Sequence, residues 1–441
     1  MAGRSERLPL GRVIPRFRKD DEVRRPPARP RVPLESRLVP RALLALAIGA
    51  FAIGTTEFVV LGMLPEIADG LGVSVSAVGI LISAYAVGVV IGAPTLTAVG
   101  LRFTPKQTLV ALMVVFVVGN VLSAVAPSYG LLVAARVVTA LAHGSFFGVG
   151  AVAARRLVPP DHATRAISLM ITGLTLANVL GVPLGTFVAQ HASWRIVLAG
   201  IALIGVVTIA GLLAWMPSDA GEPTDLRAEL RAFRSGQVWL VLALTMVGFS
   251  ALFAVYSYVS PILTDLGGIP AAWVTPVLAL FGAGTTVGTL AGGRLGDRYG
   301  FSFVAVGLVA MAGILVAFAF LARTTVAAVA LLVLFGTVAF AIGPVVQNAV
   351  IDAARVPGGS LVSAANQAAF NVANALGAAL GALVISQGLG YTAPMWIGAV
   401  LALLGAGLAV LARAGGRRAA LADAVAIVAH RQDALQRAEA A

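Results

Sequence analysis

The sequence contains no cysteine and very little charge. Of its 441 residues, 11% are charged and 59% are hydrophobic, and the mean hydropathy is +0.95. Without cysteine the chain has no disulfide, no thiolate metal site and no covalent haem attachment. A soluble domain carries roughly 25% charged residues. The charge present here cannot cover a water-exposed surface, so we expect most of the surface to face lipid.

The sequence also lacks the short motifs of common enzymes. No HExxH, GxSxG or P-loop pattern occurs, and the four histidines are scattered along the chain. We therefore expect no enzyme activity, no metal site and no bound cofactor. Without a nucleotide-binding fold, energy for active work would come from an ion gradient, and we expect the proton gradient.

What the sequence has in abundance is apolar runs of one length. A helix needs about 20 residues to cross the ~30 Å hydrocarbon core of a bilayer. Because lipid offers backbone groups no hydrogen bonds, helices are the default, and the alternating pattern of a membrane barrel is absent. We predict an all-α membrane protein with twelve transmembrane helices, near residues 41–64, 77–101, 108–126, 129–154, 163–188, 194–216, 238–264, 272–296, 301–322, 325–352, 358–387 and 391–413.

The distribution of positive charge predicts the orientation. The net charge is +12, but twelve of the 31 basic residues lie in the first 41 positions, so the charge does not indicate a nucleic-acid partner. With the N-terminus inside, the loops on the outer side hold only Arg195 and Arg323. This bias predicts a multi-pass protein of a bacterial cytoplasmic (inner) membrane with both termini cytoplasmic. The inner loops hold Arg102, Lys106, Arg155, Arg156, Arg165, Arg227, Arg231, Arg234, Arg294, Arg298 and Arg355.

Three segments fall outside the spans. Residues 1–40 are rich in Arg and Pro and are predicted to be a disordered cytoplasmic extension, or the result of a start codon placed too far upstream. Residues 217–237 are predicted to be a cytoplasmic linker with a short surface helix. Residues 414–441 alternate apolar and charged side chains at helical spacing, which predicts a cytoplasmic tail helix.

An internal repeat divides the rest into two halves, residues 41–216 and 238–413. Residues 177–188 read ANVLGVPLGTFV and residues 373–384 read ANALGAALGALV, with seven of twelve positions identical at an offset of 196. The same offset relates Pro65 to Pro261 and Gly100 to Gly296. Six spans per copy is an even number, so both copies enter the membrane in the same direction. This predicts two pseudo-symmetric six-helix bundles.

A glycine-rich loop follows the eighth span. Residues 292–300 read GGRLGDRYG. The glycines allow a tight turn and close helix approach, while Asp297 can pair across the loop or cap the next helix. An ordinary turn at a membrane exit is the alternative. The first-half counterpart carries Leu101 at the position of Asp297 and so lacks the carboxylate. The motif residues are Gly293, Gly296, Asp297, Arg298 and Gly300.

Two charged residues lie inside predicted spans. Glu57 is the only acid inside the first span, and Arg136 lies at a similar depth in the fourth. A charge in hydrocarbon costs about 3 kcal/mol or more, so it normally faces a wet cavity or a partner. Burial favours the neutral form of a carboxyl and a guanidinium favours the ionised form, so such a pair can load and release protons. We hypothesise that Glu57 carries the proton, contacts the substrate, or does both. The alternatives are a structural ion pair, and an Arg136 that extends to the outer headgroups.

The fifth span concentrates residues that bend helices or let them approach closely. These are Gly173, Gly181, Pro183 and Gly185. Polar side chains in other spans are candidates for cavity lining, because intramembrane polar groups face the bundle interior or tie helices together. The predicted substrate-cavity residues are Asn120, His143, Asn178, Asn348, Asn371 and Asn374, with Gln347, Asn366 and Gln367 as further candidates.

These stretches resemble the major facilitator superfamily, and within it the twelve-span drug:proton antiporters of the arabinose-efflux-like and chloramphenicol-exporter-like branch. The resemblance rests on residues 54–73, 92–94, 135–151 and 177–186. The glycine loop is similar to the family signature G-x-x-x-D-R-x-G-[RK]-[RK], although Phe301 and Ser302 replace the final basic pair. The fifth span resembles an antiporter signature that usually ends G-P-x-x-G.

The resemblance implies how the protein works. It implies alternating access, a loop that holds the cytoplasmic gate shut, and a span-four arginine, here Arg136, in proton coupling. It further implies a monomer that exports a small molecule, a drug such as a phenicol or a sugar, against inward proton flow. A proton-coupled or passive importer is the alternative, and a membrane enzyme or receptor is the alternative of another class. Substrate and direction stay open at this point.

Overall fold

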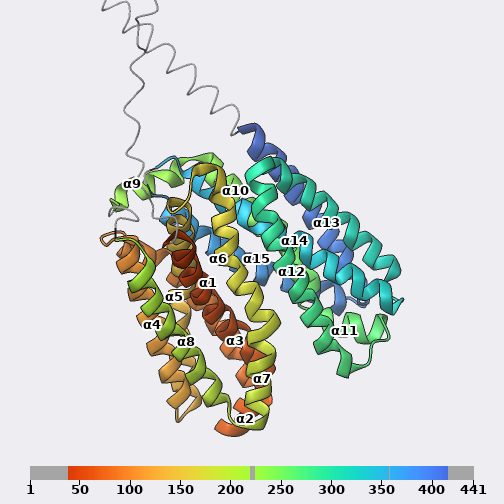
Figure 1. Ribbon diagram of the computed structural model, residues 1–441. Coiled ribbons are helices and arrows are strands. Elements are labelled where there is room, and N and C mark those ends of the chain that lie inside the picture. The colour runs from red at the N-terminus through yellow and green to blue at the C-terminus, as the bar shows by residue number, and fades with distance from the viewer. Residues whose placement is uncertain (1–37, 219–223, 357, 416–441) are drawn as a thin grey trace, which may run out of the picture.

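The computed structural model describes residues 38–218, 224–356 and 358–415 (Figure 1). The tail helix predicted for residues 414–441 lies almost wholly outside this range, and so does the extension predicted for residues 1–40. The first helix begins at Leu38, slightly before the predicted start of the first span. Within the described residues, twelve helices are long and apolar enough to cross a membrane. The predicted all-α fold with twelve spans is confirmed.

The first bundle contains six spans joined by short turns. Its long helices are α1 (Leu38–Phe58), α3 (Val75–Gly100), α4 (Pro105–Val125), α5 (Tyr129–Arg156), the fifth span made of α6 (Ala163–Leu176), the π turn η3 (Ala177–Gly181) and α7 (Val182–His191), and α8 (Trp194–Trp215). Short elements connect them: η1 (Val59–Gly62), α2 (Leu64–Leu71) and η2 (Pro160–His162).

The second bundle repeats this order after a linker. The linker carries α9 (Leu226–Arg231) and η4 (Ala232–Arg234). The spans are α10 (Gly236–Tyr256), α12 (Ala271–Tyr299), α13 (Phe301–Leu321), α14 (Thr325–Ala354), α15 (Ser360–Ser386) and a last helix, Ala393–Gly415, with the short α11 (Val259–Pro261) and η5 (Ile262–Leu266) after α10.

Local sequence sets where the spans begin. Thr104 caps α4 and forms a reciprocal capping box with Gln107, and Pro105 occupies the first turn, where its missing N–H costs nothing. Ser128 and Ser193 cap α5 and α8 with the side-chain oxygen alone, which accepts a bond from a free N–H group of the first turn. The breaks between apolar runs are therefore also helix starts, which is why the predicted boundaries fall close to the observed ones.

The seventh span ends earlier than predicted. We expected it to run to residue 264, but α10 ends at Tyr256 and two short helical pieces follow. Pro261 has no N–H for a continuous helix and clashes with the preceding turn. The length of an apolar run alone does not show where the helix ends.

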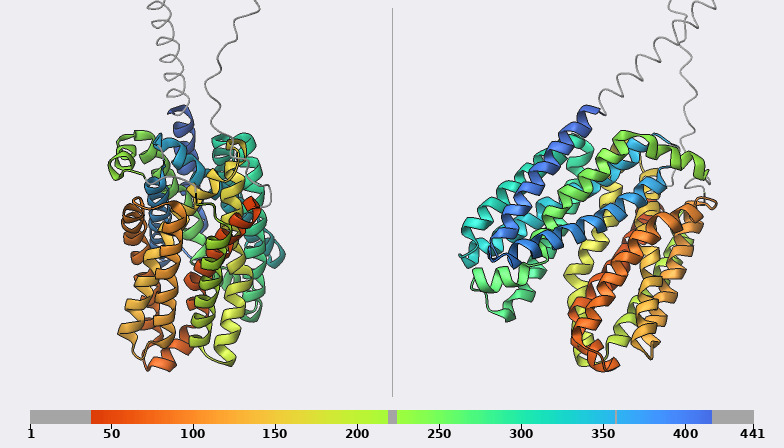
Figure 2. Two further views of the ribbon diagram at one scale, coloured as in Figure 1. Left: turned by 60° about the vertical axis from the view of Figure 1, so that its left-hand side comes forward. Right: turned by 180° about the vertical axis from the view of Figure 1, so that it is seen from behind.

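The two bundles touch at one end and separate at the other. We call the end that carries α9 the linker end; from there the bundles diverge (Figures 1 and 2). The bundles meet through α6 with α12, α3 with α15, and α5 with α15. The first two pairs are related by the sequence repeat, since α3 corresponds to α12 and α6 to α15. This contact pattern agrees with two pseudo-symmetric halves.

Candidate functional site

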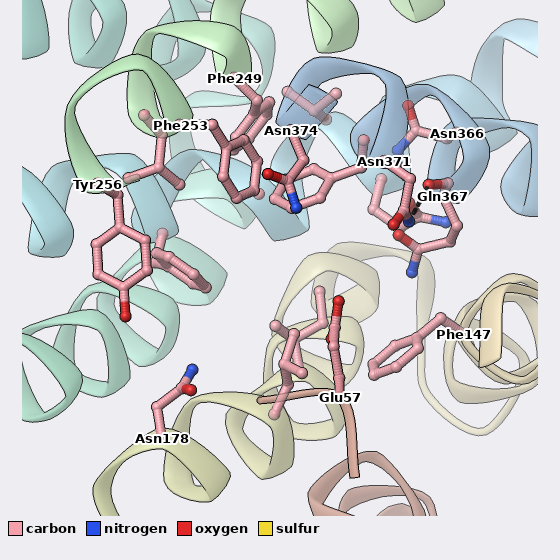
Figure 3. A pocket seen from close by; sticks show the side chains of 18 of the residues that line it. Glu57, Phe147, Asn178, Phe249, Phe253, Tyr256, Asn366, Gln367, Asn371 and Asn374 are labelled. Carbon is pink, nitrogen blue, oxygen red and sulfur yellow. Dashed lines mark hydrogen bonds between the residues drawn. The ribbon is translucent and has the colours of Figure 1, made fainter. Parts of the chain in front are cut away.

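A cavity lies between the two bundles. It holds an empty volume of about 1090 Å³, its open mouth included. Side chains of both halves face each other across it (Figure 3). The first half contributes Glu57, His143, Phe147 and Asn178, and the second contributes Phe249, Phe253, Tyr256, Gln347, Asn366, Gln367, Asn371 and Asn374. Aromatic rings and amides therefore form most of the wall.

Glu57 supplies the carboxylate of this wall. It lies in the last turn of α1 and is half-buried. No contact within 4.0 Å joins its carboxylate to the guanidinium of Arg136 in the described structure, so the predicted alternative of a structural ion pair is wrong.

Arg136 is buried behind this wall. Its residue is 1% exposed, which excludes the alternative that it extends to the headgroups. One terminal nitrogen donates a hydrogen bond to the Thr56 hydroxyl at 3.0 Å, and the guanidinium carbon lies 4.4 Å from the centre of the Tyr85 ring. In the described part of the chain, the Nε and the other terminal nitrogen have no hydrogen-bond acceptor. These two nitrogens of Arg136 can therefore still donate hydrogen bonds.

Asn120 does not line the cavity, contrary to the prediction. It is fully buried between α4 and α1, where its side-chain oxygen accepts a bond from the Thr56 hydroxyl at 2.7 Å. Its amide nitrogen donates to the carbonyl of Phe116 at 2.9 Å. Asn120 is therefore a tie between helices that also orients Thr56, the partner of Arg136.

Replacing Asn120 by alanine should lower thermal stability without changing the cavity wall. The Thr56 hydroxyl would lose a buried acceptor, which costs about 0.5–2 kcal/mol in a membrane interior. Melting of the purified protein in detergent measures this loss. Asn178→Ala is the matched control, because Asn178 lies in the cavity wall (Figure 3) and its truncation should leave the melting temperature unchanged. Equal loss in both variants would contradict the assignment.

His143 connects the Arg136 environment to the cavity. Its Nδ1 lies 3.2 Å from the Tyr85 hydroxyl, and its ring packs against Phe147 with centroids 5.3 Å apart. It is 6% exposed and lines the cavity as predicted. Tyr85 thus contacts both the guanidinium of Arg136 and the imidazole.

A hydrogen-bonded row runs from the second-half wall to the first half. The Thr245 hydroxyl donates to Asn366, whose amide donates to Gln347 at 2.6 Å. The Gln347 amide donates to Ser363 at 2.6 Å, and the Ser363 hydroxyl donates to the carbonyl of Gly148 at 2.8 Å. Because Gly148 belongs to α5 and the others to the second bundle, this row links the cavity to the interface at the linker end.

Asn178, Asn371 and Asn374 line the cavity as predicted, but Asn348 does not. Asn348 lies nearer the linker end of α14, where its amide donates to Asp352 at 3.3 Å. Asp352 in turn pairs with Arg155 of the first half at 2.7 Å. Asn348 belongs to the interface between the halves, because it is one turn from Asp352 on α14.

Asp297 caps a helix, but not the next one along the chain. Its two carboxylate oxygens accept bonds from the backbone N–H groups of Thr164 at 2.8 Å and Arg165 at 3.3 Å. These groups begin α6 in the opposite bundle. A carboxylate at a helix N-terminus satisfies free donors and complements the helix dipole. Asp297 therefore fastens the second half to the first.

The glycines of the same loop allow the halves to approach. A Cβ at Gly293 would lie 2.6 Å from the Cβ of Ser168, and one at Gly296 would lie 2.7 Å from Thr164. Gly300 has φ +55°, the left-handed region that favours glycine. Arg298 is exposed and lies 5.2 Å from the ring centre of Tyr299.

The glycines of the fifth span bring it close to α1. Gly173 contacts the backbone of Ala47, and Gly181 contacts Thr55. Gly185 packs against Val59. Between them the helix widens into the π turn η3 just before Pro183, whose ring cannot accommodate a regular hydrogen-bond ladder. The predicted close packing is present, and the π turn interrupts the regular α-helix of this span.

The sequence reading did not select Thr56, Tyr85 or Glu229. Thr56 and Tyr85 are uncharged polar residues in apolar runs. Only their contacts with Arg136 show that they belong to the site. Glu229 lies in the linker, where a carboxylate is usually solvated, yet it is fully buried. Among the described residues, no three His, Asp or Glu side chains come together to hold a metal ion.

Known proteins are similar to this chain in sequence and in fold. The chain matches the Major Facilitator Superfamily over residues 46–366. It is 42% identical to the inner membrane transport protein YdhP of Escherichia coli, over 84% of this chain and 94% of that protein. It is 34% identical to a chloramphenicol resistance protein of Streptomyces lividans, over 82% of this chain and 94% of that protein.

Solved structures agree in fold. The fucose:proton symporter FucP of Escherichia coli has a TM-score of 0.69 at 13% identity, covering 85% of this chain and 98% of its own. At that identity the likeness concerns the fold alone. The family match and the close relatives confirm the resemblance seen in the sequence motifs. The chain belongs to the Major Facilitator Superfamily and is a multi-pass transporter of small solutes.

Proposed function

We propose that the protein exports a small amphipathic molecule in exchange for protons by alternating access. The observation that carries this proposal is Glu57, a carboxylate in the wall of the central cavity with no ion-pair partner within 4.0 Å among the residues that the structure describes. A carboxylate that is neither fixed in a salt bridge nor fully solvated is suited to bind and release a proton.

Arg136 stabilises the ionised form of Glu57 without locking it. Its guanidinium contacts Thr56 and Tyr85, and two of its nitrogens have no acceptor in the part of the chain that the structure describes. When the cavity faces the proton-rich side, a proton binds the Glu57 carboxylate; when it faces the other side, the proton leaves. A bound substrate and a protonated Glu57 compete for the same cavity, which couples the two flows in opposite directions.

The cavity wall favours a substrate with a flat apolar part and several hydrogen-bonding groups. Phe249 and Phe370 lie with ring centroids 4.8 Å apart, and Tyr256 stacks on Phe281 at the same distance. The amides of Asn178, Asn371 and Asn374 line the same cavity. A phenicol has this chemistry, and the relative from Streptomyces lividans is a chloramphenicol resistance protein. A sugar would also bond to the amides, but it offers the rings less apolar surface than a phenicol does.

The orientation follows from charge. The basic loop residues gather at the linker end, so we place this end and both termini in the cytoplasm. The cavity then opens to the outside, as an exporter's cavity does when it releases its substrate. In this proposal a proton gradient across the bacterial inner membrane supplies the energy. The protein works as a monomer and uses no cofactor.

Drug susceptibility tests this proposal. The protein is overproduced in a susceptible bacterium, and growth inhibition is measured for a panel of phenicols, unrelated cationic drugs and toxic sugar analogues. We expect a several-fold rise in the inhibitory concentration of at least one phenicol. An importer would instead increase sensitivity to its substrate, and no change for any compound would contradict export of this class.

A further inference from the structure

The two halves differ at a helix cap that the repeat predicts to be shared. Asp297 accepts bonds from the backbone N–H groups of Thr164 and Arg165 at the start of α6. The offset of 196 relates Asp297 to Leu101, Thr164 to Ser360 and Arg165 to Leu361. By symmetry, residue 101 should cap the start of α15. Leucine has no acceptor, so this cap must come from elsewhere or be missing.

The linker supplies the missing carboxylate. Glu229 of α9 accepts bonds from the backbone N–H groups of Gly359 at 2.9 Å, Ser360 at 3.2 Å and Leu361 at 3.1 Å. Two of these donors are the repeat equivalents of the two donors that Asp297 binds. The same pair of N–H groups is therefore capped by a carboxylate in both halves, from a loop in one and from the linker in the other.

Glu229 is held where a loop carboxylate would be. It is fully buried, and α9 packs against α15. The N–H of Thr224, just before α9, donates to the carbonyl of Leu101 at 2.9 Å. The linker is thus fastened to the loop that lost its acid. Burial raises the pKa of Glu229, while the three amide bonds and the charge of Arg156 act in the opposite sense.

We propose that Glu229 is a positioning residue of the gate, which replaces the acid absent at Leu101 and holds α15 against the first half at the linker end. The chain of contacts runs from the first-half loop through Thr224 and Glu229 to the start of α15. Because α15 also carries the cavity residues Asn371 and Asn374, this cap restrains a helix that must move when the cavity changes sides. The inference goes beyond the proposed function, since it depends on neither substrate nor direction.

A single introduced thiol measures the state of the interface. The chain has no cysteine. Ser363 is fully buried, and its hydroxyl contacts the carbonyl of Gly148 across the halves. Ser363→Cys is close in shape, and its alkylation by a maleimide requires the linker end to open. The alkylation rate of the full-length protein in detergent is compared among variants in this background.

We expect Glu229→Ala to raise the alkylation rate about tenfold, because a charged acceptor of buried N–H groups is lost. Adding Leu101→Asp to that variant should return the rate toward the starting value, since the acid is restored at the repeat position. Leu101→Asn in the same background should restore less. Asp69→Ala removes an exposed carboxylate in α2, at the opposite end of the first bundle (Figure 1), and should change nothing.

A merely structural role for Glu229 would not produce this rescue. If Glu229→Ala does not yield a folded protein, Glu229→Gln takes its place, because it keeps one acceptor and loses the charge. An unchanged alkylation rate after removal of the carboxylate would overturn the proposal. So would a raised rate that Leu101→Asp fails to lower. Drug susceptibility is not involved, so failure here is distinct from failure of the proposed function.

Discussion

Replacing Glu57 by glutamine should abolish transport driven by a pH gradient while leaving the protein folded. Glutamine preserves the shape of the side chain but cannot bind and release a proton. Because no ion-pair partner lies within 4.0 Å of Glu57 among the described residues, its neutralisation breaks no salt bridge, and the change in unfolding free energy should stay within about 1 kcal/mol. Uptake into proteoliposomes with an imposed gradient should fall to the level of empty vesicles.

The matched control for Glu57→Gln is Asp265→Asn, which removes an exposed carboxylate that does not line the cavity. This variant should transport at the normal rate. Binding of substrate to Glu57→Gln, measured without a gradient, separates loss of coupling from loss of affinity. Gradient-driven transport that survives in Glu57→Gln would mean that another group carries the proton.

Gly148→Val should trap the protein with its linker end open and stop transport. Gly148 faces α15 so closely that a Cβ would lie 2.7 Å from the backbone N and Cα of Ala364. The neighbouring atoms are backbone and cannot rotate away. Overpacking of this kind costs about 1–3 kcal/mol, and the protein can avoid the cost by separating the two halves. The population should shift by about tenfold or more toward the open linker end.

Gly130→Val is the control on the same helix. A Cβ at Gly130 meets no atom of the described residues within 4 Å, so this variant changes helix propensity without touching the interface. Transport and the alkylation rate of Ser363→Cys report on both variants. Gly148→Val should stop transport and raise the alkylation rate, whereas Gly130→Val should alter neither. Normal transport by Gly148→Val would show that this contact need not form during the cycle.

The repeat at offset 196 allowed most of the fold to be predicted. It identified α3 and α12 as equivalent helices, and α6 and α15 as another equivalent pair. In the structure α6 packs against α12 and α3 packs against α15, as that equivalence requires. Span length, cap residues and loop charge supplied the rest. These signals are local and periodic, which is why the sequence carries them clearly.

The candidate site was harder to predict because polarity alone does not tell a cavity residue from a helix tie. Asn178 and Asn120 have the same side chain and both lie inside spans, yet one faces the cavity and the other binds Thr56. Residue type alone does not distinguish these two environments. Arg136 and Glu57 were found because a charge in hydrocarbon is rare, but the partners of Arg136 were not.

The cap at α15 was missed for a different reason. The sequence shows that Leu101 lacks the acid found at Asp297, which indicates a lost contact. It does not show that a residue more than a hundred positions away, Glu229, occupies the same place. A replacement supplied from the linker leaves no motif, and only the backbone donors that it satisfies reveal it.

The central claim is that outward movement of substrate is coupled to inward movement of protons through Glu57. Inside-out membrane vesicles containing the protein, acidified within and supplied with a radiolabelled phenicol, test it most directly. We predict accumulation of the phenicol inside the vesicles, collapse of that accumulation when a protonophore is added, and no accumulation with Glu57→Gln. Accumulation that persists after the gradient is abolished, or that Glu57→Gln retains in full, would contradict it.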